Sequence, residues 1–104
     1  MDISPNPDVL FQELTTEFAG AKPGLHHWSR TTELAEWNTP ENVKKSFNSI
    51  DFLRVRSGCT VAVFNLSGKK FRLIAYIRYA TKQVFFLRLL SHHIYSKDRW
   101  VHEL

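Results

Sequence analysis

The sequence predicts an α+β domain in which N-terminal helices pack on one face of a small antiparallel β-sheet. Three observations lead to this prediction: helix-start signals with apolar residues at helical spacing in the first half, β-branched and aromatic residues in the second, and short turn sequences between them. The 104 residues, 43% hydrophobic and 23% charged, have the size and composition of one globular domain. We therefore expect a single domain, 1–104, with a helical part at about 7–48, a β-meander at about 52–90 and a polar C-terminal tail at 91–104.

The first half predicts three helices. Residues 6–8 supply an Asn N-cap, a first-turn proline and an acid that opposes the helix dipole, and an apolar stripe follows at Leu10, Leu14 and Phe18. We expect Gly20 and Pro23 to end this helix. A second helix is expected over about 25–37, and Thr39 followed by Pro40 predicts the start of a third.

The second half predicts a three-stranded meander. Residues 60–66, 70–79 and 84–90 are strand-like, and the segments between them have turn composition. The tail from residue 91 is expected to form a loop and a short terminal helix.

Alternation along the second and third strands separates two faces. One face is apolar and should pack on the helices, whereas the other collects arginines and an aromatic ring: Arg72, Arg78, Arg88 and Tyr76. Such a face can bind a single-stranded phosphate backbone and stack a base. The alternative is a solvated face on which tyrosine and arginine stack on each other.

Charge is distributed unevenly along the chain. The net charge is +4, yet residues 1–52 carry −4 and residues 53–104 carry +8, with no carboxylate between Asp51 and Asp98. A basic half on a small domain indicates a polyanionic partner, either a nucleic acid or an acidic protein, unless the asymmetry arises by chance.

Several classes of protein are disfavoured. A single cysteine, Cys59, precludes an internal disulfide and fits a reducing compartment, and no apolar run approaches the ~20 residues of a membrane span. The N-terminal residues lack the features of a secretory signal. Adjacent histidines at 26–27 and 92–93 lack the spacing of metal ligands. We expect a cytoplasmic protein without metal, cofactor or membrane partner.

An ordered set of short motifs resembles a known family. Residues 63–68 (VFNLSG), 71–74 (FRLI) and 91–95 (SHHIY) are similar to segments of HigB-type toxins, which belong to the RelE-like group of bacterial toxin–antitoxin systems. Upstream, the chain also resembles this family at Trp28, Ala35-Glu36-Trp37, Pro40 and Phe47. The similarity covers roughly residues 10–97.

The resemblance implies a RelE-like fold and a metal-independent endoribonuclease (an mRNA interferase) that cuts mRNA on the ribosome. A helix-turn-helix antitoxin of the HigA-like kind would neutralise it. In this group the RNA 2′-hydroxyl attacks the adjacent phosphate, which leaves a 2′,3′-cyclic phosphate and a free 5′-hydroxyl.

That chemistry assigns roles to three candidate catalytic residues. Arg72 would bind the phosphate, His92 would act as acid or base, and Tyr95 would stack or transfer a proton. The expected RNA-binding residues, of which Lys69 or Lys70 would also stabilise charge, are Lys69, Lys70, Tyr76, Arg78, Arg88 and Lys97.

The chain departs from the family pattern at several positions. Lys69 replaces an asparagine, and Ile94 and Ser96 replace the acids that flank the tyrosine. Leu87 stands where the family has arginine, so Arg88 would point to the opposite face unless a β-bulge restores the register. Because the acids that flank the tyrosine are missing, a degenerate and inactive member of the family remains an alternative.

Two other functions remain alternatives. One is a toxin on the same fold that inhibits a protein target such as DNA gyrase, as the ParE branch does. The other is a non-catalytic RNA-binding domain. The pair of His92 and Tyr95 after the last strand favours the ribonuclease, since a pure binder does not need it.

Overall fold

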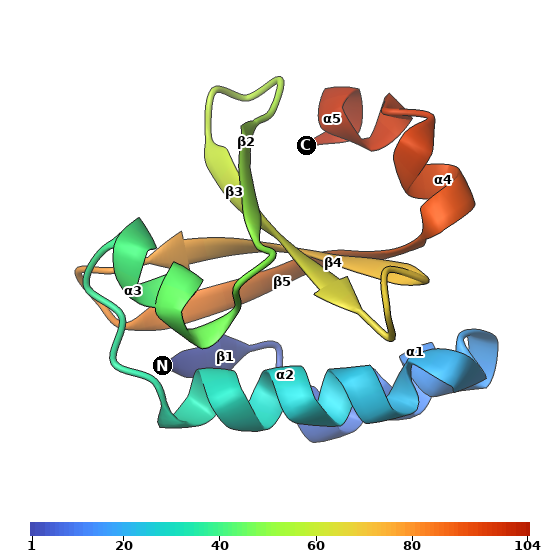
Figure 1. The fold of residues 1–104 in the computed structure, drawn as a ribbon, viewed down its shortest axis with the longest axis horizontal. Helices are drawn as coiled ribbons and strands as arrows, with labels where there is room; N and C mark the ends of the chain where they lie inside the picture. Colours follow the sequence, from blue (N-terminus) through green and yellow to red (C-terminus); the bar gives the residue numbers. More distant parts are fainter.

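The computed structural model describes all 104 residues and has two main layers, a group of helices and a five-stranded sheet (Figure 1). The strand order is β1-β5-β4-β3-β2, in which β1 runs parallel to β5 and every other pair is antiparallel. The predicted α+β class is confirmed. The strands are β1 (Asp2–Ser4), β2 (Asp51–Arg54), β3 (Thr60–Leu66), β4 (Phe71–Arg78) and β5 (Gln83–Ser91).

Two of the three helices in the first half begin at the predicted capping signals. The side chain of Asn6 accepts the Asp8 N–H at the start of α1 (Pro7–Glu17), and Thr39 caps α3 (Pro40–Ser46) in the same way. The expectation that Pro23 ends the first helix is wrong. A 3₁₀ turn follows α1, and Pro23 then lies in the first turn of α2 (Lys22–Leu34), where its missing N–H costs no hydrogen bond.

Two strands are missing from the sequence-based prediction. The three residues of β1 pair with the start of β5, 81 positions further along the chain, and β2 pairs with β3. Both lie at the edges of the sheet. Such short strands depend on long-range pairing, and their own residues carry little local signal.

The main core lies between the helices and one face of the sheet, as predicted. Trp28 of α2 packs edge-on against Phe64 of β3, with ring centroids 5.7 Å apart. Leu73 and Ala75 of β4 face the same core and are fully buried. This arrangement fixes which side of β4 faces away from the helices.

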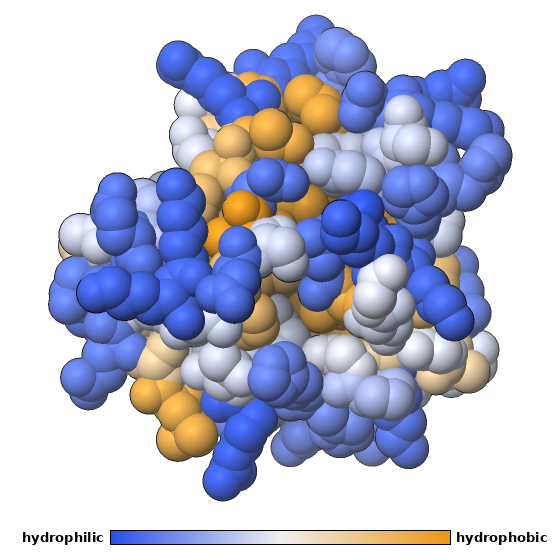
Figure 2. All heavy atoms as spheres, viewed as in Figure 1, coloured by the Kyte–Doolittle hydropathy of each residue, from blue (hydrophilic) through white to orange (hydrophobic).

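The opposite face is not open along its length, contrary to the prediction. The tail folds into two short helices, α4 (His92–Ser96) and α5 (Arg99–Glu103), and Trp100 of α5 packs in a second core with Ile74. Both side chains are at most 2% exposed. In Figure 2, polar residues cover most of the visible surface, and an apolar area lies beside the β2–β3 hairpin near α5.

A β-bulge changes the register between β4 and β5. Ile74 pairs with Arg88, whereas the next residue, Ala75, pairs with Phe86, so Leu87 is the additional residue. Paired residues share a face, and Arg88 therefore lies on the Ile74 side of the sheet. The β-bulge therefore restores the register, and Arg88 lies on the same face of the sheet as Arg72. No helix is long and apolar enough to span a membrane.

Candidate active site

Arg72 lies at the centre of a small polar site where β4 begins. Its side chain is 8% exposed, and Nη1 donates to the backbone carbonyl groups of Lys69 and Phe71. Nη2 lies 3.4 Å from Nδ1 of His92. None of these hydrogen bonds goes to a carboxylate. A buried cation is normally paired with an anion, so this guanidinium is preorganised for an anion from outside the protein.

The end of β5 places His92 beside Arg72. Phe71 pairs with Ser91, and the N–H of His92 then donates to the carbonyl of Lys70 over 2.9 Å. The Ser91 hydroxyl caps α4 by accepting the Ile94 N–H at 3.3 Å. The imidazole itself is exposed. A guanidinium can only donate, so Nδ1 of the neutral ring accepts and Nε2 carries the proton.

Tyr95 completes the group from the next turn of α4. Its ring centroid lies 5.1 Å from Cζ of Arg72, within cation–π range. Burial, followed by the charge of Asp51, raises the pKa of the Tyr95 phenol, while Arg72 acts in the opposite direction. The phenol therefore keeps its proton at neutral pH and can donate a hydrogen bond.

Trp100 supports Tyr95 from α5. The two rings stack with centroids 5.4 Å apart and an interplanar angle of 21°, and the Trp100 indole N–H donates to the Tyr95 carbonyl over 3.2 Å. Trp100 lies in the tail that the sequence analysis describes as polar. Its link to Tyr95 depends on how α5 folds back, which no local motif shows.

The lysines predicted to bind RNA surround this site in part. Lys69 and Lys70 lie in the β3–β4 turn with exposed side chains, and their carbonyl groups hold Arg72 and His92, respectively. Lys69 adopts a left-handed conformation with φ 74°. Lys97 is also exposed, at the C-cap of α4. Cations on two sides of the site would attract a polyanion.

The other predicted RNA-binding residues are not all in one place. Arg78 lies six residues along β4 from Arg72, roughly 20 Å away at strand spacing, and Tyr76 contacts the ring of Phe85 instead. Arg88 is exposed and donates to the carbonyl of its neighbour Leu87 over 2.9 Å. Arg88 pairs with Ile74 and so shares the face of Arg72 and Arg78, as predicted, but Trp100 packs with Ile74 between the two ends of that face.

No group of three or more histidine, cysteine or carboxylate side chains is arranged to hold a metal ion. The site consists of a guanidinium, an imidazole and a protonated phenol, with two lysines at its rim. These groups can bind a phosphate and move protons next to it.

Two comparisons with known proteins bear on the identity of this chain. Residues 21–98 match the family described as HigB_toxin, a RelE-like toxic component of a toxin-antitoxin system. The mRNA interferase HigB of Escherichia coli O6:H1 (strain CFT073) is 26% identical over 87 residues, which cover 84% of this chain and 82% of that protein. The family match includes all three residues of the site and extends over most of the fold. The chain therefore belongs to the HigB family of RelE-like toxins, the toxic components of toxin–antitoxin systems.

Proposed function

We propose that this toxin is an endoribonuclease that cleaves mRNA in the cytoplasm during translation on the ribosome and is neutralised by a HigA-like helix-turn-helix antitoxin. The observation that carries the proposal is the buried Arg72 guanidinium, which has no carboxylate partner and lies 3.4 Å from an imidazole. The similarity to an mRNA interferase supports RNA as the substrate that supplies the missing anion.

The reaction is an in-line transesterification within the RNA. The 2′-oxygen forms a bond to phosphorus as its proton leaves, and the bond from phosphorus to the 5′-oxygen breaks. The products are a 2′,3′-cyclic phosphate and a 5′-hydroxyl, so no water or other co-reactant enters this step. Arg72 would bind the phosphate through its planar fork and stabilise the charge that develops there.

The two proton transfers fall to His92 and Tyr95. When the phosphate draws the Arg72 guanidinium, Nδ1 of His92 is released to accept the 2′-proton. The phenol of Tyr95 retains its proton because of its raised pKa, and it donates toward the leaving 5′-oxygen. Lys69, Lys70 and Lys97 would hold the flanking phosphates, and Arg88 a more distant one.

A cleavage assay with purified toxin and ribosomes translating a defined mRNA tests this proposal. Arg72→Ala and His92→Ala should each lower the cleavage rate by about a hundredfold or more, while both proteins remain folded. Arg30→Ala on α2 and His93→Ala are matched controls, since both side chains are exposed and neither joins the site. Full cleavage by both site variants would refute the assignment. Toxicity with intact mRNA would instead support inhibition of a protein target.

A further inference from the structure

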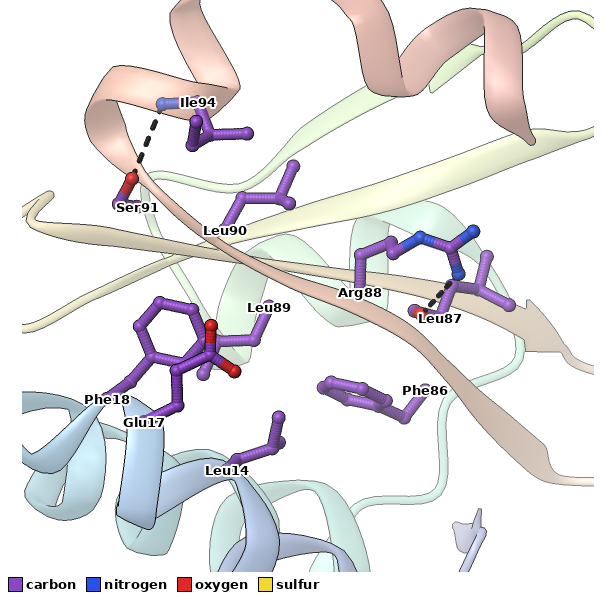
Figure 3. Close-up of a pocket in the computed structure, with 10 residues that line it drawn as sticks. All are labelled: Leu14, Glu17, Phe18, Phe86, Leu87, Arg88, Leu89, Leu90, Ser91 and Ile94. Atoms are coloured by element: carbon purple, nitrogen blue, oxygen red, sulfur yellow. Dashed lines mark hydrogen bonds between the residues drawn. The ribbon is translucent and has the colours of Figure 1, made fainter.

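A groove runs along the outer edge of β5, on the side of the molecule next to α1 (Figure 3). Its volume is about 470 Å³, and ten residues line it, seven of them hydrophobic. They are the consecutive residues 86–91 of β5, two residues of α1 and its C-cap residue, and one residue of α4: Leu14, Glu17, Phe18 and Ile94.

The lining shows that the groove follows the backbone. Side chains of a strand alternate between the two faces of a sheet, so six consecutive residues can border one hollow only along the strand's edge. The pairing of β1 with this edge ends at Ser4 and Phe85, and no strand pairs with residues 86–91 on that side. Backbone N–H and C=O groups of β5 are thus left available beside an apolar surface.

We infer that this open edge binds an extended segment of the antitoxin, which adds to the sheet as a strand beside residues 86–91. The inference rests on the antitoxin partner included in the proposed function. A partner strand of about six residues, roughly 20 Å long, would cover this edge. It continues the edge that β1 already occupies over Gln83–Phe85.

The chemistry of the groove favours a polypeptide as its occupant. Alternating apolar side chains on the partner would fill the space between Leu14 and Phe18 on one side and Ile94 on the other, as Figure 3 shows. A carboxylate on the partner would pair with Arg88, whose guanidinium has only the Leu87 carbonyl as a partner. RNA fits poorly, because it offers no strand pairing and would meet the carboxylate of Glu17.

A second copy of the toxin also fits poorly. Two copies that paired antiparallel through residues 86–91 would have their symmetry axis at residue 88 or at residue 89, so that the two Arg88 side chains would lie directly opposite or diagonal to each other. Like charges at such a position destabilise a strand pair.

The position of the groove explains how the bound segment would neutralise the toxin. The groove ends at Ser91 and Ile94, and Ser91 caps the helix that carries His92 and Tyr95. A strand held there would abut α4 and restrict access of RNA to the site.

Amide hydrogen exchange of the wild-type toxin tests the inference directly. The probe is the purified helix-turn-helix protein encoded beside the toxin gene, added in excess. Amides within residues 86–91 that exchange in the free toxin should become protected in the mixture. The inference is wrong if the two proteins bind without new protection there, if they do not bind, or if protection rises with toxin concentration alone, which would indicate a second toxin copy.

Two matched variants of α1 provide an independent test. Leu14→Gln places an amide in the groove and should weaken antitoxin binding about tenfold. Val9→Gln makes a similar change on an exposed side chain of the same helix that does not line the groove, and binding should be unchanged. Equal affinities for the two variants would count against the groove. If Leu14→Gln is unfolded, the exchange experiment alone decides.

Cleavage measured with the same free proteins separates the two proposals. Leu14 lies on α1, away from the polar site, so Leu14→Gln should cleave mRNA at the wild-type rate. If the wild type does not cleave mRNA, the proposed ribonuclease function is wrong. If the amides of β5 gain no protection, only the proposed binding of an antitoxin strand is wrong.

Discussion

At the scale of single residues, Arg72 makes two sets of contacts at once, which a lysine in its place could not make. One nitrogen is bound to carbonyl groups of the β3–β4 turn while another lies against His92. Only a planar fork with several donors reaches both sides at once, and a lysine presents a single ammonium group on a flexible chain. The guanidinium therefore organises the turn and the imidazole together, beside the proposed phosphate position.

Arg72→Lys should consequently retain the charge and lose most of the activity. We expect the rate of the cleavage step to fall by at least about tenfold, because one ammonium group cannot replace the bidentate contact. Single-turnover kinetics at saturating RNA measure this step. Arg30→Lys on the exposed side of α2 is the control and should behave as the wild type. A wild-type rate for Arg72→Lys would show that a charge alone is sufficient.

Removal of the Arg72 side chain should also change the pKa of Tyr95. Arg72 lowers the pKa of Tyr95 against the larger effect of burial, so Arg72→Ala should raise that pKa further. Ultraviolet absorbance of the phenolate, compared between Arg72→Ala and Arg72→Ala/Tyr95→Phe, follows this one tyrosine. An unchanged or lowered pKa would mean that the two side chains do not interact in solution.

The same raised pKa values predict a loss of stability at alkaline pH. The pKa values of Tyr79 and Tyr95 are both raised, mainly by burial. The unfolded chain therefore releases these protons first, near pH 10, and the free energy of unfolding falls as the pH rises from there through the folded pKa values. Below about pH 10 the two groups cause no pH dependence.

Urea unfolding measured at pH 8 and above pH 10 checks this effect. A Tyr79→Phe/Tyr95→Phe double variant should lose less stability over that range than the wild type does. Equal losses in the two proteins would assign the alkaline transition to other groups.

At the scale of elements, the helices and strands that the sequence predicts correctly are those whose signals lie within or next to their own residues. The strand over residues 60–66 was predicted with its observed bounds, and α1 and α3 begin where their capping residues indicated. These elements carry capping side chains or alternation within their own residues. β1 and β2 do not, since pairing with distant strands creates them, and the fold of α5 depends on Trp100 reaching Ile74.

For the candidate site, the sequence indicated the three side chains but not how they are held. The motif resemblance pointed to Arg72, His92 and Tyr95, and the structure places the other two side chains beside the Arg72 guanidinium. It could not show that backbone carbonyl groups of the turn hold the guanidinium. It also could not show that a tryptophan outside the matched segment supports Tyr95.

Trp100 should therefore act as a positioning residue through α4. Trp100→Phe keeps an aromatic ring against Tyr95 but loses the indole N–H that binds its carbonyl. We expect a several-fold lower cleavage rate at saturating RNA with little change in KM, since the lysines proposed to bind the RNA strand are unaffected. Trp100→Ala should lose about 3–5 kcal/mol of unfolding free energy, as for other large buried side chains.

Two results for Trp100→Phe would identify a positioning role. The first is a lower kcat with an unchanged KM, and the second is a lowered pKa of Tyr95, because its ring becomes more exposed. Leu34→Ala, which removes a largely exposed side chain on α2, is the control and should leave all three quantities unchanged. Parallel losses in stability and in RNA affinity, with an unaltered cleavage rate for Trp100→Phe, would reduce Trp100 to a packing role.

At the scale of the whole molecule, the charges divide between the helical half and the sheet half. The basic residues of the second half include the lysines around the site, whereas the helices carry most of the acids. RNA binding should therefore weaken steeply with salt, because each phosphate contact releases counterions. The helical layer should contribute little to this dependence.

A pair of matched double variants tests this division. Lys69→Ala/Lys70→Ala should lower RNA affinity and make the slope of log affinity against log salt shallower by about one to two. Lys44→Ala/Lys45→Ala on α3 removes the same charge from the helical half and should leave the slope unchanged. Filter binding to a short single-stranded RNA by the inactive His92→Ala protein measures both. Identical slopes for the two variants would show that binding follows net charge alone.

The chain order of the elements has a consequence for the cell that makes this toxin. Arg72 emerges from the ribosome before β5, α4 and α5, and it meets His92 only after β5 has paired with β4. A nascent chain that has not yet received these last segments lacks the histidine, the tyrosine and the tryptophan beneath it. A chain synthesised only as far as β5 therefore lacks the side chains proposed to transfer protons, which are added with α4.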